Sequence, residues 1–244
     1  MTRTSRAGAL AAGALALALA LSGCLGATPT PTPDAAPATT AIEATPTAEP
    51  VDPLTTVTAA VARPEALELV DGSGAVVMSL DYLGDGDDAV ATLSVVLGGA
   101  PIDEPYDSGN HHPSGVRHTW DDAIEIDERF YPEERRAGLA SELSWPRFAV
   151  TFLAPTVRGV DLTTATDVHV GDSLAALGEQ IDPELWTCTG WALEHVEVPR
   201  TDFPPLKIGV GVSEWAYDAA GHWSQTVDRV VTVSAPVTVA DGCA

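Results

Sequence analysis

The sequence predicts a β-rich α+β fold with two similar halves, each made of a short helix packed on an antiparallel sheet. Three observations lead to this prediction. Short alternations of apolar and polar residues recur along the chain, glycine-rich turn signals separate some of them, and only two segments carry the start and stop signals of a helix. The predicted folded part, residues 54–244, is long enough to bury a substantial core.

The first 24 residues have the pattern of an export signal. Arg3 and Arg6 form a short basic start, and residues 8–21 form an apolar run that is too short to span a bilayer comfortably. The segment Leu21-Ser22-Gly23-Cys24 resembles the lipobox of bacterial lipoproteins. The resemblance implies that residues 1–23 are a lipoprotein signal peptide and that the sulfur of Cys24 carries lipid, whose two or more acyl chains give stable attachment. An ordinary signal peptide with an incidental cysteine is the alternative.

Residues 24–53 are predicted to be the lipidated cysteine and a disordered tether. Residues 28–53 are rich in threonine, proline and alanine and lack the large apolar side chains that offset the entropy of ordering. A proline-rich chain of this length extends to roughly 80 Å. The tether would hold a domain away from the membrane, either as a bare spacer or with O-linked sugar on its threonines.

Strands dominate the prediction for the rest of the chain. Asp71-Gly72-Ser73-Gly74 is a turn signal between two of them. Alternating or continuous apolar patterns predict strands at residues 76–80, 123–126, 148–152, 193–198, 208–212 and 230–233.

Two segments are predicted to be short helices. The first ends at Gly98 and the second at Gly178, because glycine favours the left-handed conformation that ends a helix. The candidate caps are Asp87 or Asp88 for the first helix and Asp172 or Ser173 for the second. The inward-facing positions are Val90, Leu93 and Leu97 in the first, and Leu174 and Leu177 in the second.

The two helical segments suggest an internal repeat. Residues 97–103 are similar to residues 177–182, and each stretch precedes a strand that is predicted to begin with tryptophan, at Trp120 and at Trp191. The period is about 70 to 80 residues, and the two predicted halves are residues 54–160 and 161–244. Chance similarity between short β-rich stretches is the alternative.

This organisation resembles a group of uncharacterised actinobacterial cell-envelope lipoproteins. The shared features are the lipobox, the Thr/Pro tether, a helix start of the Gly-Asp-Ser-Leu type and the helix end at residues 97–101. More distantly, the repeated halves are similar to the β-lactamase-inhibitor-like modules of outer-membrane assembly lipoproteins. Both resemblances rest on structural motifs and imply no active site.

The charge excludes two classes of partner. The chain has 12 Lys and Arg against 35 Asp and Glu, and the mature chain keeps 10 of the 12 cations and all 35 acids, for a net charge of −25. Nucleic acids and anionic membrane surfaces require basic patches. The expected partners are therefore the membrane, reached through the lipid, and an envelope protein or wall polymer.

The three cysteines are assigned by position and compartment. Cys24 is the lipidation site, and Cys188 and Cys243 remain as an even pair in an oxidising compartment, which favours a disulfide. The enclosed loop of 55 residues corresponds to roughly 4 kcal/mol of chain entropy. Two free thiols, or a metal pair with His195, are the alternatives.

Aromatic residues gather in the C-terminal part of the chain. Exposed aromatic side chains stack on sugars and anchor protein interfaces, although buried ones simply fill a core. Both interpretations stay open at this point. The candidate binding surface consists of Trp186, Trp191, Trp215, Tyr217 and Trp223.

The segment Gly171-Asp172-Ser173-Leu174 resembles the motif of the GDSL esterases, whose nucleophilic serine stands at such a turn. A serine nucleophile also needs a base and an oxyanion hole. The only asparagine, Asn110, precedes the serine, and Asp218 and His222 have three residues between them where that family has two. A helix cap at Ser173 is therefore the better prediction, and a serine hydrolase with His222 as base is kept as an alternative.

Two further patterns suggest metals without specific spacing. Asp85-Gly86-Asp87-Asp88 lacks the ligand spacing of an EF-hand, so a turn with a helix cap is preferred. His111, His112 and His118 lie near Asp107, Asp121 and Asp122, a donor set suited to Zn²⁺ or Ni²⁺, but an exposed loop with solvated histidines explains them equally.

We therefore expect a non-enzymatic binding module on the extracytoplasmic face of the cell membrane, with no catalytic residues, metal or cofactor. A metal-binding lipoprotein that uses the loop with His111 and His118 is the second alternative besides the hydrolase.

Overall fold

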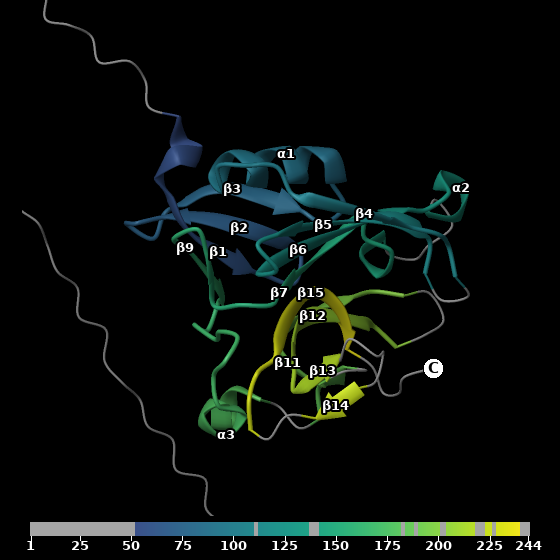
Figure 1. The fold of residues 1–244 in the computed structure, drawn as a ribbon. Coiled ribbons are helices and arrows are strands. Elements are labelled where there is room, and N and C mark those ends of the chain that lie inside the picture. Colours follow the sequence, from purple (N-terminus) through teal and green to yellow (C-terminus); the bar gives the residue numbers. More distant parts are fainter. Residues whose placement is uncertain are drawn as a thin grey trace, which may run out of the picture. The chain divides into compact units, whose positions relative to one another are not determined.

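The computed structural model of the chain describes residues 52–109, 112–136, 142–181, 184–187, 190–200, 204–217, 223–225 and 228–239. Cys24, Cys188 and Cys243 lie outside the described residues, as do the predicted signal peptide and nearly all of the tether. The predicted β-rich α+β class is confirmed, since short helices accompany two sheets whose strand pairs are almost all antiparallel (Figure 1). The described part of the chain belongs to one compact unit, Glu49–Ala244.

The first sheet has five strands and one parallel pair. Strands β1 and β9 run parallel, with Ala60 opposite Leu162, and the other neighbours are antiparallel. The strand order is β3 (Val76–Asp81), β2 (Ala66–Asp71), β1 (Val57–Ala62), β9 (Val160–Thr164) and β8 (Thr156–Val157).

The second sheet has eight antiparallel strands. A separate two-stranded ribbon, β13 (Trp215–Tyr217) with β14 (Trp223–Gln225), follows strand β12 (Leu206–Ser213) of this sheet along the chain. The strand order of the large sheet is β10 (Trp186–Thr187), β11 (Gly190–Val198), β12 (Leu206–Ser213), β15 (Thr232–Val239), β7 (Phe148–Phe152), β6 (Ile124–Phe130), β5 (Ser114–Trp120) and β4 (Ile102–Tyr106).

Helix α1 (Gly86–Val96) is the longest helix of the described residues, and its predicted cap is corrected. Asp85, not Asp87 or Asp88, caps it, because Asp85 has an extended backbone and its carboxylate accepts a 2.9 Å hydrogen bond from the Asp87 amide. Gly98 has a φ of 68°, as expected for the residue that ends a helix. The shorter helical elements are η1 (Pro53–Thr56), α2 (Glu133–Arg136), η2 (Glu142–Ser144), α3 (Leu174–Leu177) and η3 (Gly178–Gln180).

One hydrophobic core joins both sheets, α1 and α3. The period-two pattern of β2 buries Leu67 and Leu69 completely, and β6 likewise buries Ile124 and Ile126. The largest fully buried side chains are Trp120, Tyr82, Phe148 and Phe152. Of the residues described, none belongs to a helix that is both long and apolar enough to cross a bilayer.

Trp120 is placed differently from its prediction. It ends β5 and does not lead a strand, because Asp121 and Asp122 both adopt positive φ and form the tight turn into β6. The two predicted halves share both sheets. Strand β9 begins at Val160, next to the predicted boundary, and pairs with β1, while β15 pairs with β7. Each sheet therefore draws strands from both sides of residue 160.

Candidate functional site

The start of helix α3 is held by its cap residue, Ser173, and by Asp228, which lies 55 positions later in the sequence. As predicted for one of the two candidate caps, Ser173 caps the helix: its hydroxyl accepts a 3.3 Å hydrogen bond from the Ala176 amide. The same hydroxyl donates to Asp228 at 2.7 Å, and the other carboxylate oxygen of Asp228 accepts from the Ala175 amide at 2.6 Å. These contacts tie the first turn of α3 to the segment that precedes β15.

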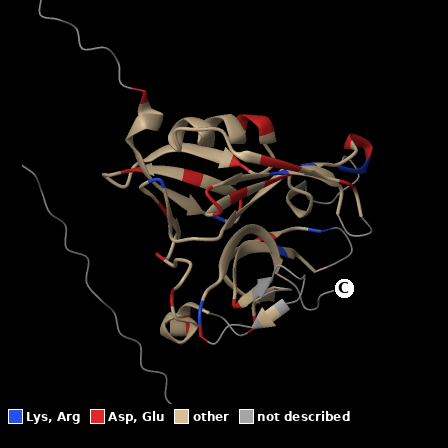
Figure 2. Cartoon of the chain, in the orientation of Figure 1, with Lys and Arg blue, Asp and Glu red and all other residues tan. Residues whose placement is uncertain are grey.

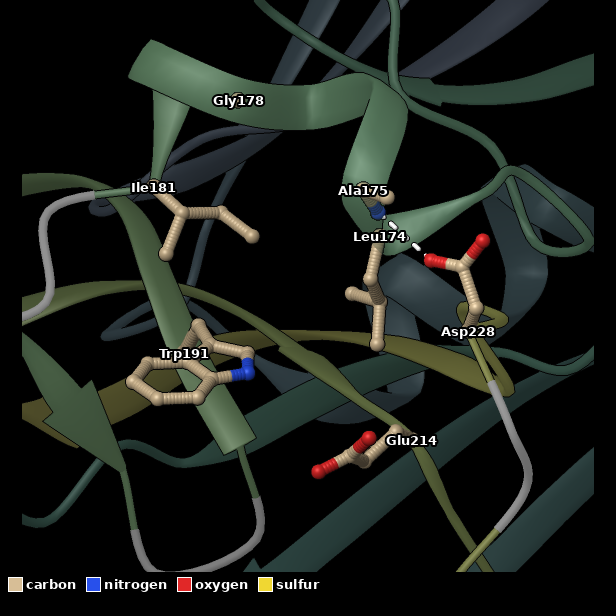
Figure 3. A pocket seen from close by; sticks show the side chains of 7 residues that line it. All are labelled: Leu174, Ala175, Gly178, Ile181, Trp191, Glu214 and Asp228. Carbon is tan, nitrogen blue, oxygen red and sulfur yellow. Dashed lines mark hydrogen bonds between the residues drawn. The ribbon is translucent and has the colours of Figure 1, made fainter.

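A pocket of about 540 Å³ lies beside this capped turn. In Figure 3 the turn from α3 into η3 arches over Trp191, Ile181 lies above the indole, and Leu174 points down into the space between the indole and Asp228. The wall is mainly apolar and aromatic, as in most ligand sites of proteins. Its lining residues are Leu174, Ala175, Gly178, Ile181, Trp191, Glu214 and Asp228. We call it the tryptophan pocket.

Two carboxylates give the tryptophan pocket a negative charge. The Ser173 hydroxyl and the Ala175 amide hold the pKa of Asp228 below its usual value, so this group is ionised at neutral pH. Glu214 is the second acidic residue of the lining, and none of the described residues that line the pocket is a lysine, arginine or histidine. The pocket is therefore suited to ligands that donate hydrogen bonds and carry no negative charge.

The structure separates the five predicted aromatic residues. Trp186 and Trp191 are direct partners in the pairing of β10 with β11, and both are half-buried, but only Trp191 lines the pocket. Trp215 is 37% exposed at the start of β13. The backbones of Tyr217 and Trp223 are opposite each other in the ribbon, and their side chains lie outside the described part of the structure.

Ser173 has the contacts of a helix cap. Its hydroxyl bonds to a carboxylate and to the backbone, and its predicted base, His222, and Asp218 lie outside the described residues. His169, four residues before Ser173, faces three carboxylates: its Nε2 is 3.1 Å from Asp161, and its Nδ1 is 3.8 Å from Asp172.

The charges around His169 determine its titration. Burial lowers the pKa of this imidazole, but the hydrogen bond with Asp161 and the charges of Asp161, Asp167 and Asp172 raise it more, so the net direction is upward. One oxygen of Asp167 is 4.0 Å from Nε2. Asp161, Asp167 and His169 also form one of the two groups of potential metal ligands among the described residues.

The predicted histidine loop is not assembled as a metal site in the described residues. His118 is buried in β5, where Nδ1 is 2.8 Å from Asp103 and Nε2 is 3.4 Å from Glu128. His112 is exposed and bonds to the carbonyl of Pro113, and His111 lies outside the described residues. The other group of potential metal ligands is Asp85, Asp87 and Glu128. Asp85 caps α1 and accepts a hydrogen bond from the Asp87 amide, and Glu128 contacts His118.

The acidic residues near the histidines have other partners or are exposed. Asp121 forms a two-bond ion pair with Arg158, at 2.7 and 2.8 Å, and Asp122 is exposed in the same turn. Burial raises the pKa of Glu128, while the hydrogen bond with His118 opposes this effect.

Sequence reasoning missed three residues of the tryptophan pocket: Ile181, Glu214 and Asp228. Each is within or close to a feature that was recognised: Ile181 belongs to the compared stretch 177–182, Glu214 precedes Trp215, and Asp228 precedes the predicted strand at 230–233. No local pattern connects them, because the pocket forms only when α3, β11 and the segments flanking β12 and β15 meet.

No family model matches this chain, and no curated protein or solved structure is similar enough to count as a match.

Proposed function

We propose that the chain is an exported lipoprotein, anchored through Cys24, whose folded unit binds another component of the cell envelope in the tryptophan pocket. The anchor and the tether follow from the sequence of residues 1–53. The observation that carries the binding role is the pocket itself, whose lining combines an indole, two large aliphatic side chains and two acidic residues. Its envelope ligand is a protein segment or wall polymer that is neutral or cationic at the contact.

The contacts of Ser173 support a binding role over hydrolysis. A nucleophilic serine donates its proton to a base, commonly histidine, whereas here the hydroxyl donates to a carboxylate with a lowered pKa and holds the helix start. A carboxylate of this kind is a weak base, because its proton affinity is low. Ser173 and Asp228 instead stabilise the wall of the pocket.

The test is a crosslinking pull-down of the lipidated protein from its own cells, with Cys24→Ala as the control that lacks the anchor. We expect one envelope protein or wall polymer to be enriched by the anchored form. Its loss in Trp191→Ala and in Glu214→Gln, with retention in Trp186→Ala, would support the tryptophan pocket. Trp186 is a suitable control because it is the direct strand partner of Trp191 and is also half-buried, yet lies outside the lining.

Glu214→Gln is included because Trp191→Ala alone does not separate a loss of binding from a loss of stability. Trp191 packs against the core, so its truncation affects stability as well as binding. Glu214→Gln changes charge and little volume. Equal capture by the wild type and both pocket variants would overturn the proposed site, and an empty result with the anchored wild type would overturn the binding role.

A further inference from the structure

The second feature that points to a ligand is a cavity of about 900 Å³ at the end of β6, next to α2. Its charged lining consists of Arg129, Arg135 and Glu134, with His112 at the edge. The lining thus has more arginine than acid, in a chain where acids outnumber Lys and Arg by 35 to 12. We call this cavity the arginine groove.

Scarce cations are concentrated near this groove. Arg136 and Arg147 line the adjoining cavity, which shares Arg129 with the groove and is also lined by three acidic residues, Asp85, Asp87 and Glu128. Glu133 lies 2.9 Å from Arg147 and 3.8 Å from Arg136. Figure 2 shows acidic positions over both sheets and α1, and blue beside red at α2. Helix α2 accordingly has acidic residues in its first turn and basic ones in its last. Arg129, Arg136 and Arg147 have acidic partners, so contact with an anion in the groove relies on the exposed Arg135.

The arginines have different roles in the groove. The Nε of Arg129 donates a 2.7 Å hydrogen bond to Asp127, and Asp127 also accepts a 2.5 Å hydrogen bond from the Tyr106 hydroxyl. These contacts hold the half-buried Arg129 in one orientation. Arg135 is exposed at the groove and supplies an accessible guanidinium, which suits two-point contact with a carboxylate or phosphate.

Aromatic rings form the other part of the lining. The rings of Tyr131 and Trp145 stack with a centroid distance of 4.8 Å and an angle of 31°. Phe130 is 52% exposed and lines the same groove. Flat apolar rings beside hydroxyls favour a ring-shaped ligand with polar edges, and the hydroxyls here come from Ser108, Ser114 and Ser144.

We propose that the arginine groove binds an anionic saccharide, a sugar ring that carries a carboxylate or a phosphate. The guanidinium of Arg135 contacts the anion, and Phe130 contacts the face of the ring. The charged residues differ from those of the tryptophan pocket, whose described lining contains two acids, Glu214 and Asp228. The groove is thus a second site, and its test does not depend on the first.

The test is isothermal titration calorimetry of the full chain with five probes: sodium glucuronate, glucose 1-phosphate, glucose, acetate and inorganic phosphate. We expect one or both sugar anions to bind about tenfold more tightly than glucose and than the free anions. The two sugar probes show whether a carboxylate or a phosphate is preferred. Equal affinity for glucose would overturn the role of charge, equal affinity for free anions would overturn the role of the ring, and no binding of any probe would overturn the site.

Substitutions at two exposed residues separate the contribution of the charge from that of the aromatic ring. Arg135→Gln is expected to weaken the sugar anions about tenfold and to leave glucose unchanged. Phe130→Ala is expected to weaken both sugar anions and to leave phosphate and acetate unchanged. The matched control is Arg117→Gln, which removes the same charge from an arginine that pairs with Glu104 and Glu125 outside the groove. An equal loss in Arg135→Gln and Arg117→Gln would show a general charge effect and overturn the proposed site.

Discussion

Ser173 donates a 2.7 Å hydrogen bond to the carboxylate of Asp228, a residue 55 positions later in the chain. The bond joins the start of α3 to the segment before β15, and Asp228 lines the tryptophan pocket together with Leu174 and Ala175, which follow Ser173. Because α3 has only four residues, its own hydrogen bonds are too few to hold it in place. The stability of the pocket wall therefore depends on this contact and on the cap.

Ser173→Ala is expected to lower the free energy of unfolding by about 1 kcal/mol, the usual effect of removing a serine cap. Urea denaturation measures it. The control is Ser94→Ala, since the Ser94 hydroxyl donates to the carbonyl of Val90 inside α1 and caps nothing. An equal loss in the two variants would contradict the role of the cap.

His169 is expected to make stability depend on pH. Its pKa in the folded protein is raised above the ordinary 6.5, so its contribution is fully present below pH 6.5 and is lost as the pH rises through the folded pKa. The melting temperature of the wild type should therefore fall, relative to that of His169→Gln, as the pH increases above 6.5. His112→Gln, at an exposed histidine outside the cluster, is the control and should follow the wild type. A constant difference between wild type and His169→Gln would refute the assignment.

Gly86 and Glu128 are expected to be energetically coupled. A Cβ at Gly86 would lie 2.6 Å from Oε1 of Glu128, whose side chain is buried and bonded to His118. Gly86→Ala should therefore destabilise the wild type but be neutral or stabilising in a Glu128→Ala background, because alanine is otherwise the better helix former. A double-mutant cycle by urea denaturation should give a coupling of about 1 kcal/mol.

The control for this cycle is Gly72→Ala. Its Cβ would make only an ordinary 3.8 Å contact with Thr58, so its effect should be additive with Glu128→Ala. Additive effects of Gly86→Ala and Glu128→Ala would show that the carboxylate moves away without cost.

Trp120 is expected to be the tryptophan most sensitive to a conservative change. Its side chain is 1% exposed, and its Nε1 donates a 2.9 Å hydrogen bond to the carbonyl of Gly99. Trp120→Phe should lower the free energy of unfolding by about 2 kcal/mol, through the lost hydrogen bond and the space left behind. Trp145→Phe, at a half-buried ring, should cost less than half as much. Chemical denaturation followed by circular dichroism distinguishes the two.

The fold class and several elements could be predicted because their patterns are local. Strand β7 matches its predicted range, residues 148–152, since its apolar run is bounded on both sides. Helix α3 was predicted with one of its two candidate caps, Ser173, and with its end at Gly178, whose φ is 49°. In both cases the residues that set the structure lie within a few positions of it.

Elements that depend on distant residues were missed. Strand β4 has no buried position and contains Pro105, so it carries no alternating signal and is defined only by its pairing with β5. Neither β1 nor β9 carries a local sequence pattern that predicts their parallel pairing. The carboxylates of the tryptophan pocket come from segments flanking two other strands, and the arginine groove combines β6, α2 and η2, so neither site could be assembled from the sequence.

The pairing of β1 with β9 also affects how the protein folds as it is made. Ala60 and Leu162 are partners 102 residues apart, and Val233 of β15 meets Phe152 of β7 across 81 residues. The N-terminal part of a nascent chain is made first, so β1 remains an open edge of the β1–β3 meander until β9 has been made. Such high contact order slows folding and leaves that edge available to other strands in the meantime. A chain with this topology benefits from a chaperone, or from high net charge, which the surplus of acids supplies.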